Sequence, residues 1–315
     1  MNSNDTPHPS LRRISTDGKK VANIPDMTPD LSEGDLSIII PAKNEMATIG
    51  QVVTNARQVF PNAEIVVVDD GSTDDTGRLA QDAGARVIRH PESLGNGAAV
   101  KRGAREARGE ILAFMDGDGQ HDAKEFVSML DKLAGGYHMI IGAREARSHA
   151  NVGRLFANGF YNGFASLVCS RRIPDLTSGL RVVRADYFRQ FLYLLPNGFS
   201  YPTTITMAFL RSGYPVGFVT VNAAKRSGKS HIRPLRDSVR FLAIIFKIAT
   251  LYAPLKVFLP VSATFFVTGV GYYAYTYLTI GRFTNMSLLV LSASVIIFLI
   301  GLISEQITAL TFSKA

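Results

Sequence analysis

Two long apolar segments near the C-terminus constrain the fold of this chain more than any other feature. Residues 255–280 (LKVFLPVSATFFVTGVGYYAYTYLTI) carry one charge, in their first turn, and residues 286–303 (MSLLVLSASVIIFLIGLI) carry none. Each segment is close to the ~20 residues that a helix needs to cross a bilayer. Because only GRFTN separates them, they predict a transmembrane hairpin, with spans at about 255–280 and 286–308 in a region 253–315. The unbroken apolar lengths argue against the alternative, two buried helices in a soluble core.

The positive charge of the chain is concentrated next to this hairpin. Residues 225–256 hold eight Lys or Arg and one acid, Asp237, a net charge of +7 out of +8 for the chain. Basic residues that flank a span mark its cytoplasmic side and attract anionic lipids. We therefore expect a multi-pass protein of the cytoplasmic (inner) membrane, with its larger part in the cytoplasm. The adjacent span disfavours nucleic acid, the competing partner for a basic patch.

Two further segments have amphipathic spacing. Residues 231–252 predict a juxtamembrane helix that lies in the lipid interface or packs on the core. Residues 148–169 leave the same two alternatives open.

The N-terminal residues and the cysteine content add two limits. Residues 1–35 are polar, lack apolar periodicity and lack the apolar core of a signal peptide, so they predict a disordered leader. The single cysteine, Cys169, excludes an intramolecular disulfide and a cysteine-based zinc site, and fits a reducing compartment.

Between these parts, residues 36–230 alternate short β-branched runs with helical patterns. This alternation predicts an α/β domain with a mostly parallel sheet and helices on both faces. In such a sheet, ligands bind at the carboxyl ends of the strands. The expected strands are 36–41, 64–70, 85–90, 110–116 and 137–143, and the expected helices are 46–59, 74–83, 97–108 and 122–134.

Polar motifs follow the first two expected strands. The first is PAKNE at 41–45 and the second is DDGSTDDT at 69–76. A capped turn between a strand and a helix explains Gly71, Ser72 and Asp74. It does not explain Asp69 and Asp70 at the end of the strand, where acids can accept hydrogen bonds from a base or a ribose.

A third motif, GNGAAVKRG at 95–103, places small residues where a helix begins, which lets backbone amides approach a phosphate. It does not match G-x-G-x-x-G, because residue 100 is Val, and no G-x-x-x-x-G-K-[ST] loop is present. Taken alone, the motif is weak.

The fourth motif, FMDGDGQHD at 114–122, follows another expected strand. Asp116, Asp118 and Gln120 offer the hard oxygen ligands that Mg²⁺ or Mn²⁺ prefers, and such a metal often also binds substrate phosphates. A calcium loop fails, because its sixth position is His121 and its twelfth is Val127. Capping of the following helix suits Asp122 but not Asp118.

Together, these motifs resemble the family-2 glycosyltransferases of the GT-A fold, and in particular the polyprenyl-phosphate sugar transferases related to dolichol-phosphate mannose synthase. The resemblance covers residues 36 to about 230. The motifs, in order, are PAKNE, VVVDDGSTDDT, LGNGAAVKRG, FMDGDGQHD, IIGAR, DLTSGLRVVRAD and RSGKSHI. Where that family usually has D-A-D-x-Q-H-P, this chain has Gly117 and Asp122 in place of Ala and Pro; both changes spare the ligands.

The resemblance implies roles for individual residues. The implied nucleotide-binding residues are Pro41, Ala42, Asn44, Glu45, Asp69, Asp70, Ser72, Gly97, Lys101 and Asp116. The implied metal ligands are Asp116, Asp118 and Gln120. The residues implied to receive the lipid phosphate are Arg144, Arg154, Arg226, Lys229 and Ser230. Of all these, Asp118, Arg144 and Arg226 would act in catalysis. The segment around Arg154 departs from the family pattern.

The implied reaction moves one hexose from a UDP- or GDP-sugar to undecaprenyl or dolichyl phosphate, with inversion, on the cytoplasmic face of a membrane. Mg²⁺ or Mn²⁺ would be the cofactor, membrane lipids would be partners, and self-association through the hairpin is credible. One alternative is a processive polysaccharide synthase of the same fold. It is disfavoured by the absence of Trp, which its Q-x-x-R-W pattern needs, and by only two spans. The other is a catalytically silent membrane scaffold, which the intact acids disfavour.

Overall fold

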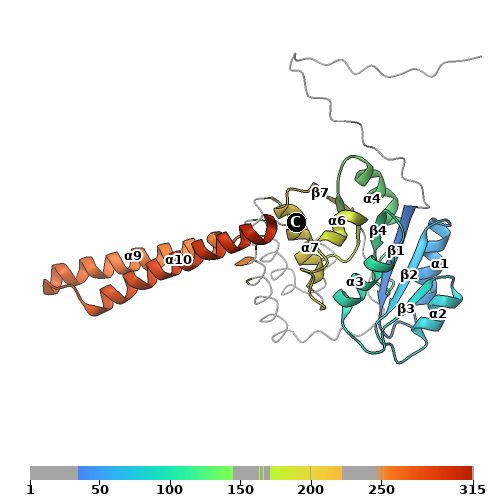
Figure 1. Cartoon of the computed structure of the whole chain (residues 1–315), viewed down its shortest axis with the longest axis horizontal. Helices are drawn as coiled ribbons and strands as arrows, with labels where there is room; N and C mark the ends of the chain where they lie inside the picture. Colours follow the sequence, from blue (N-terminus) through green and yellow to red (C-terminus); the bar gives the residue numbers. More distant parts are fainter. Residues whose placement is uncertain are drawn as a thin grey trace, which may run out of the picture.

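The computed structural model describes residues 35–144, 163, 166, 171–198, 200–221, 246, 249, 250 and 252–313. The predicted leader and nearly all of the segments 148–169 and 231–252 therefore lie outside the described residues. Two parts can be distinguished, an α/β domain and a long helical hairpin that extends away from it (Figure 1).

The α/β domain is built on one seven-stranded sheet with the order β3-β2-β1-β4-β6-β5-β7. All neighbouring strands are parallel except β6, which is antiparallel to both β4 and β5. The strands are β1 Leu36–Ala42, β2 Glu64–Asp69, β3 Arg86–Arg89, β4 Ile111–Phe114, β5 Met139–Arg144, β6 Arg181–Arg184 and β7 Val216–Val221. The first five confirm the predicted strands, whereas β6 and β7 were not predicted.

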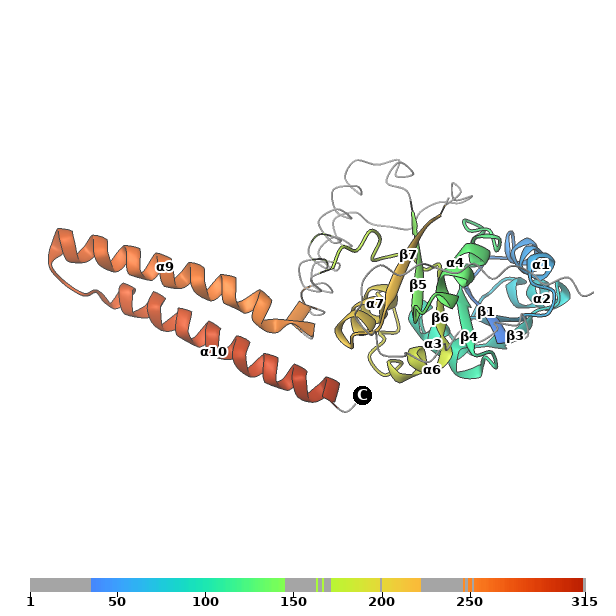
Figure 2. The same cartoon turned by 90° about the horizontal axis from the view of Figure 1, so that it is seen from above.

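Helices cover both faces of the sheet, as predicted (Figure 2). On one face lie α1 (Ile49–Val59), α2 (Thr76–Asp82) and α4 (Glu125–Ala134). On the other lie α3 (Asn96–Glu106), α6 (Ala185–Gln190) and α7 (Tyr201–Arg211). Successive strand residues belong to different cores: Ile39 is in the core that contains residues of α3 and α7, and Ile38 is in the core that contains residues of α1 and α4. This two-sided burial explains why the strands read as continuous apolar runs.

The two apolar segments form α9 (Pro254–Ile280) and α10 (Asn285–Ser313), which pair along their length. Gly281 ends α9 in the left-handed conformation, with φ +67°. Both helices are long and apolar enough to cross a membrane. The predicted hairpin is thereby confirmed as a pair of helices, and both of its ends lie beside the α/β domain (Figures 1 and 2).

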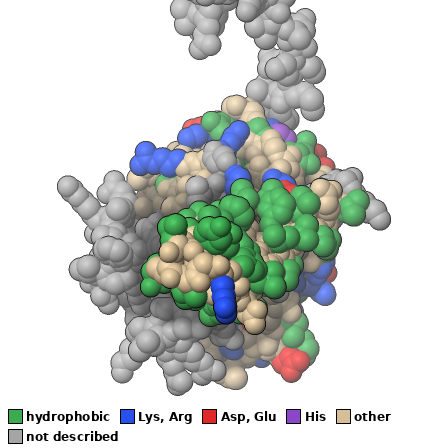
Figure 3. Space-filling model, turned by 90° about the vertical axis from the view of Figure 1, so that its left-hand side faces the viewer, with side chains coloured by type: hydrophobic (Ala, Val, Ile, Leu, Met, Phe, Trp, Pro, Cys, Tyr) green, Lys and Arg blue, Asp and Glu red, His purple; other side chains and the backbone are tan. Residues whose placement is uncertain are grey.

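The hairpin exposes its apolar side chains. Leu278 is 83% exposed and Leu289 is 63% exposed, so the helices are not the buried core pair of the alternative interpretation. In the end-on view, hydrophobic side chains cover most of the hairpin (Figure 3). Small residues face the partner helix instead: a Cβ on Gly301 would lie 2.7 Å from Phe258 Cβ, and Ser262 and Ser294 each donate a hydrogen bond to the other's carbonyl oxygen, at 2.9 and 3.0 Å.

The end of the 231–252 segment packs on the α/β domain. Ala249 and Tyr252 are buried in the same core as α7, and the Tyr252 hydroxyl donates to the Thr204 carbonyl oxygen at 3.3 Å. Phe246 is exposed. For the described residues at its end, core packing is therefore the observed arrangement.

The close approach at Gly301 generates a test of the hairpin. Gly301→Leu should destabilise the helix pair, because overpacking typically costs about 1–3 kcal/mol, and should lower the melting temperature of the protein in detergent. Gly271→Leu is the matched control on α9, since a Cβ there would meet nothing within 4 Å. Equal melting temperatures for the two variants would contradict the observed packing.

Candidate functional site

The polar motifs come together at the edge of the sheet where β1, β2 and β4 end. Ala42 is the register partner of Asp69. The Asp70 amide donates to the Ala42 carbonyl oxygen at 2.9 Å, and the Met115 amide donates to that of Ile39 at 3.2 Å. These bonds continue the parallel ladder past the strand ends, so that Pro41, Ala42 and Asp69, the last residues of β1 and β2, and Asp70 and Asp116, just after β2 and β4, lie at the ends of three adjacent strands.

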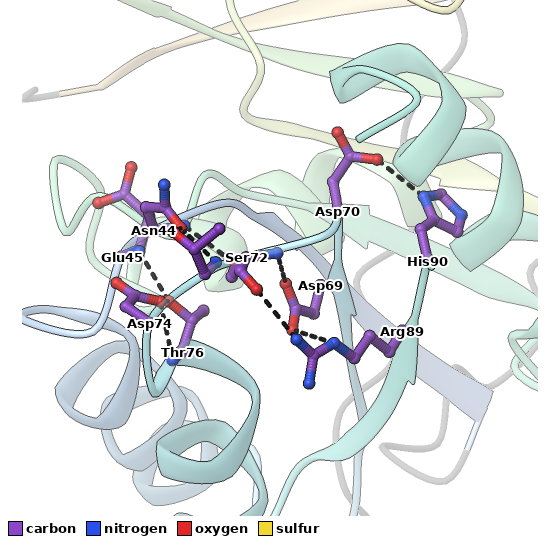
Figure 4. Close-up of polar contacts among 10 residues, drawn as sticks. Asn44, Glu45, Asp69, Asp70, Ser72, Asp74, Thr76, Arg89 and His90 are labelled. Atoms are coloured by element: carbon purple, nitrogen blue, oxygen red, sulfur yellow. Dashed lines mark hydrogen bonds and ion pairs between the residues drawn. The ribbon is translucent and has the colours of Figure 1, made fainter. Parts of the chain in front are cut away.

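The loops after β1 and β2 are hydrogen-bonded into a single unit (Figure 4). Asn44 has φ +54°, a left-handed conformation that Asn tolerates better than most residues. Its amide donates to Ser72 Oγ at 3.0 Å, and its Oδ1 accepts from the Thr73 amide at 2.9 Å. The Glu45 amide donates to Thr76 Oγ1 at 2.8 Å. Two of the predicted site residues, Asn44 and Ser72, thus hold each other in place.

Asp69 and Asp70 are both buried, and their side chains point in opposite directions (Figure 4). Asp69 Oδ1 accepts from the Ser72 amide at 2.8 Å. Its Oδ2 lies 3.6 Å from Arg89 Nε and has no hydrogen-bond partner among the described residues. Asp69 Oδ2 is thus enclosed within the protein, where the positive charge of Arg89 faces it.

Asp70, in contrast, uses both oxygens inside the protein. Oδ1 contacts His90 Nδ1 at 2.8 Å and accepts from the Leu94 amide at 2.9 Å. Oδ2 accepts from Ser93 Oγ at 2.8 Å and from the Gly95 amide at 2.9 Å. Burial alone would raise the pKa of this carboxyl, but these hydrogen bonds outweigh it and hold the pKa below its ordinary value. Asp70 thereby ties the end of β2 to the loop before α3.

The glycines of the third motif make a close backbone contact within the protein. A Cβ on Gly97 would lie 2.1 Å from the Pro196 carbonyl oxygen, and the Ala98 amide donates to the Asn197 carbonyl oxygen at 3.1 Å. Lys101 Nζ donates to the Leu195 carbonyl oxygen at 3.0 Å and to Asn197 Oδ1 at 2.6 Å. In this structure, Gly97 and Lys101 thus anchor the segment before α7.

The end of β4 carries the predicted metal ligands. Asp116, Asp118 and Gln120 are all partly exposed, and Asp118 Oδ1 accepts from the Gln120 amide at 3.1 Å. No group of three or more His, Cys, Asp or Glu suited to a metal occurs among the residues that the structure describes. Two carboxylates and an amide oxygen nevertheless fit a hard divalent cation, because Mg²⁺ usually takes one or two protein carboxylates and completes its shell with water and substrate phosphates.

The segment before β6 packs directly against Asp116. A Cβ on Gly179 would lie 3.0 Å from Asp116 Oδ2, so a glycine allows this approach. The neighbouring Arg181 is fully buried; its Nη2 donates to the Ser178 carbonyl oxygen, and its guanidinium lies 5.6 Å from the centre of the Tyr201 ring. Burial lowers the pKa of Arg181. The motif DLTSGLR contains both residues, but its local pattern gave no role to either.

Arg144, at the end of β5, is paired with Asp175. Arg144 Nε and Nη2 donate to the two oxygens of Asp175 at 2.8 and 3.2 Å, and Nη2 also donates to Thr177 Oγ1 at 2.8 Å. Burial opposes both charges, yet the paired hydrogen bonds raise the pKa of Arg144 and lower that of Asp175. Sequence reasoning found Arg144 but not the carboxylate that orients it. The other predicted lipid-phosphate residues, Arg154, Arg226, Lys229 and Ser230, lie outside the described residues.

Both parts of the chain match known protein families. Residues 37–192 match the family described as glycosyl transferase family 2, and residues 253–310 match the family described as GtrB C-terminal hairpin. The glycosyltransferase AglJ of Haloferax volcanii is 29% identical over 298 residues, which are 90% of this chain and 95% of that protein. The dolichol-phosphate mannosyltransferase of Pyrococcus furiosus is 36% identical over 233 residues, 66% of this chain and 63% of that protein.

A solved structure shares the fold. Glucosyl-3-phosphoglycerate synthase from Mycobacterium tuberculosis, in complex with Mn²⁺, uridine diphosphate and glucosyl-3-phosphoglycerate, superposes with a TM-score of 0.55 at 22% identity. The match covers 70% of this chain and 85% of that one. It agrees with the predicted GT-A fold, in which a mostly parallel sheet has helices on both faces.

The bonding of Asp70 generates a pH-dependent test. Asp70→Asn replaces an acceptor-only carboxylate that faces several donors, so it should lower the stability at neutral pH by about 1–3 kcal/mol. Because the folded-state pKa of Asp70 is lowered, its contribution is complete above the ordinary value of 3.8 and is lost as the pH falls through the folded-state pKa.

Thermal unfolding in detergent at a series of pH values measures this effect. The difference in melting temperature between the wild type and Asp70→Asn should be largest near neutrality and should shrink below the ordinary pKa of 3.8. Asp131→Asn, which makes the same charge change at an exposed position of α4, is the control and should match the wild type. A difference in melting temperature between the wild type and Asp70→Asn that stays constant with pH would refute the electrostatic explanation.

Proposed function

The chain belongs to glycosyl transferase family 2, and we propose that it moves a single hexose from a nucleotide-diphosphate sugar to a polyprenyl phosphate at the cytoplasmic face of a membrane. The observation that carries this proposal is a combination of two features. An acidic site lies at one sheet edge, after β1, β2 and β4, and the domain that contains it is attached to an exposed apolar hairpin.

The donor would lie along the ends of β1 and β2. We assign Pro41, Ala42, Glu45 and Asp69 to direct contact with the nucleoside, because they lie where the parallel strands end. Asn44, Ser72 and Asp70 support this surface by holding its loops together. Gly97 and Lys101 contribute by anchoring the segment before α7.

The diphosphate of the donor would bind at the end of β4. Asp116, Asp118 and Gln120 supply oxygen ligands for Mg²⁺ or Mn²⁺, and the named mycobacterial synthase was solved with Mn²⁺ and uridine diphosphate. When bound, such an ion stabilises the charge that develops on a diphosphate leaving group. Gly179 and the segment held by Arg181 would keep the Asp116 carboxylate in place.

The acceptor would approach from the Arg144 side of the site. A phosphate monoester is already ionised near neutral pH, so its attack needs no strong general base. It needs positive charge that brings it close to the donor despite the repulsion between phosphates. Arg144 is held in a fixed orientation by Asp175 and Thr177, which take its Nε and Nη2 donors, so it would offer a phosphate its positive charge and its Nη1 donors. We assign Arg226, Lys229 and Ser230 to the same role from the RSGKSHI motif, and Arg154 from its place after IIGAR. Direct displacement would invert the anomeric carbon.

The mannosyltransferase of Pyrococcus furiosus, named for a dolichol-phosphate acceptor, supports an acceptor of this class. The hairpin would place the enzyme in the bilayer that contains such a lipid. The basic residues 225–256 would face the anionic headgroups on the cytoplasmic side.

A transfer assay tests the proposal. The purified full chain in detergent, with Mg²⁺ or Mn²⁺ and undecaprenyl phosphate, is offered a panel of radiolabelled UDP- and GDP-sugars, and the product is extracted into an organic phase. We expect label in that phase with one donor, and none with EDTA or without the lipid. Nucleotide binding without transfer from any donor would overturn the proposed acceptor.

In the same assay, Asp118→Ala should reduce transfer by more than about 100-fold, because losing a direct ligand costs more than losing the groups that orient one. The matched control is Asp122→Ala, four residues along the same loop. Asp122 is exposed, and its Oδ1 accepts from the Lys124 amide at 3.0 Å in the turn before α4. Comparable loss in both variants, or retained activity in Asp118→Ala, would remove Asp118 from the metal site.

A further inference from the structure

The hairpin and the α/β domain meet at a carboxylate that binds both. Glu305, on α10, is the only acidic residue between positions 254 and 313. Its Oε1 accepts from Arg211 Nη2 at 3.1 Å, and its Oε2 accepts from the Leu255 amide at 3.2 Å. We call Arg211, Glu305 and the Leu255 amide the joint.

Each contact in the joint has a physical reason. An acid in an apolar spanning helix is costly unless it is paired, so its presence points to a function. Leu255 lies in the first turn of α9, where backbone amides have no partner within the helix and where negative charge is favourable. Glu305 therefore fastens the end of the hairpin's second helix to the start of its first. Its other oxygen, Oε1, accepts a hydrogen bond from Arg211 of the catalytic domain.

Arg211 connects the joint to the site through a rigid element. It is the last residue of α7, and the first nine residues of that helix are buried. At the other end of α7, Arg181 Nη1 donates to the Pro202 carbonyl oxygen at 3.4 Å, and the Arg181 guanidinium lies over the Tyr201 ring. Arg181 also holds the Ser178 carbonyl oxygen beside Gly179, which packs on Asp116. In Figures 1 and 2 the C-terminal end of α10 returns to α7.

We propose that the joint fixes the orientation of the catalytic domain over the membrane, so that the site faces the phosphate of an acceptor embedded in the bilayer. Arg211 and Glu305 are then positioning residues that touch neither substrate. This inference rests on the proposed function. The phosphate of a membrane lipid stays at the depth of the headgroups, whereas a phosphate in water can approach from any direction. Only transfer to the membrane lipid depends on how the domain is oriented.

The test compares two acceptors. The full chain, reconstituted in bilayer nanodiscs, is assayed with undecaprenyl phosphate in the bilayer and with a short, water-soluble prenyl phosphate. Glu305→Gln and Arg211→Met should each lower kcat/KM for the bilayer acceptor by about tenfold or more, because small errors in positioning are costly for transfer. For the soluble acceptor, kcat/KM should stay within about twofold of the wild type. Arg211→Lys, which keeps the charge, should restore part of the loss.

A matched control comes from another ion pair of the same kind. Arg78, on α2, contacts Asp75 Oδ2 at 3.0 Å through its Nη2 and is exposed. Helix α2 lies on the side of the α/β domain away from the hairpin (Figure 1). Arg78→Met should leave kcat/KM for both acceptors unchanged, because exposed pairs contribute only about 0–1 kcal/mol.

The outcomes separate the two proposals. A wild type that transfers sugar to neither acceptor would overturn the proposed function. The role of the joint would be overturned if the wild type uses both acceptors and the joint variants lose kcat/KM equally for both. It would also be overturned if the variants lose kcat/KM for neither acceptor. Retained use of the soluble acceptor also shows that the variants are folded, so a selective loss reports orientation rather than stability.

Discussion

The parallel register of β1, β2 and β4 is the constraint on which the site depends. Backbone hydrogen bonds between these strands leave no freedom in where each strand ends relative to its neighbours, and the bonds from Asp70 and Met115 extend the ladder by one residue beyond β2 and β4. Three motifs that are separated by dozens of residues in the sequence therefore meet at one edge. The antiparallel β6 brings a fourth segment to the same edge, because an antiparallel strand begins where its neighbours end.

Many of the polar groups around this edge are already bonded before any substrate arrives. Asp70 is saturated by the loop before α3, Arg144 is held by Asp175, and Lys101 is held by the segment before α7. Such contacts cost reactivity at the bonded atoms but fix the positions of the loops that carry the remaining groups. For a reaction that relies on placing two phosphates beside each other, fixed loops are worth more than additional charges.

Much of the fold follows from local pattern, and the missing parts have a physical explanation. The first five strands are apolar runs buried on both faces. The hairpin can be predicted from segment length and hydropathy alone. The strand β6 is only RVVR, and its central pair of Val residues does not distinguish a strand from a turn. Among the site residues, Asp116 and Asp118 were found because their cluster has no simple structural explanation. Asp175 was not, because it lies in the segment before β6 while its partner Arg144 ends β5, and only the sheet order brings them together. A glycine at the start of a helix is compatible with close packing, as Gly97 packs on Pro196 here, and equally with an open phosphate site, so the sequence could not distinguish the two.

The reciprocal hydrogen bonds between Ser262 and Ser294 have a mechanical consequence. Each hydroxyl donates to the backbone of the other helix, so a slide of one helix along the other would break both bonds at once and leave each hydroxyl to bond within its own helix. The hairpin therefore has a set length. If the hairpin spans a bilayer, as we propose, it would adapt to a different thickness by leaning as one body rather than by shortening, and the thickness of the membrane would then set the angle at which the α/β domain meets its surface.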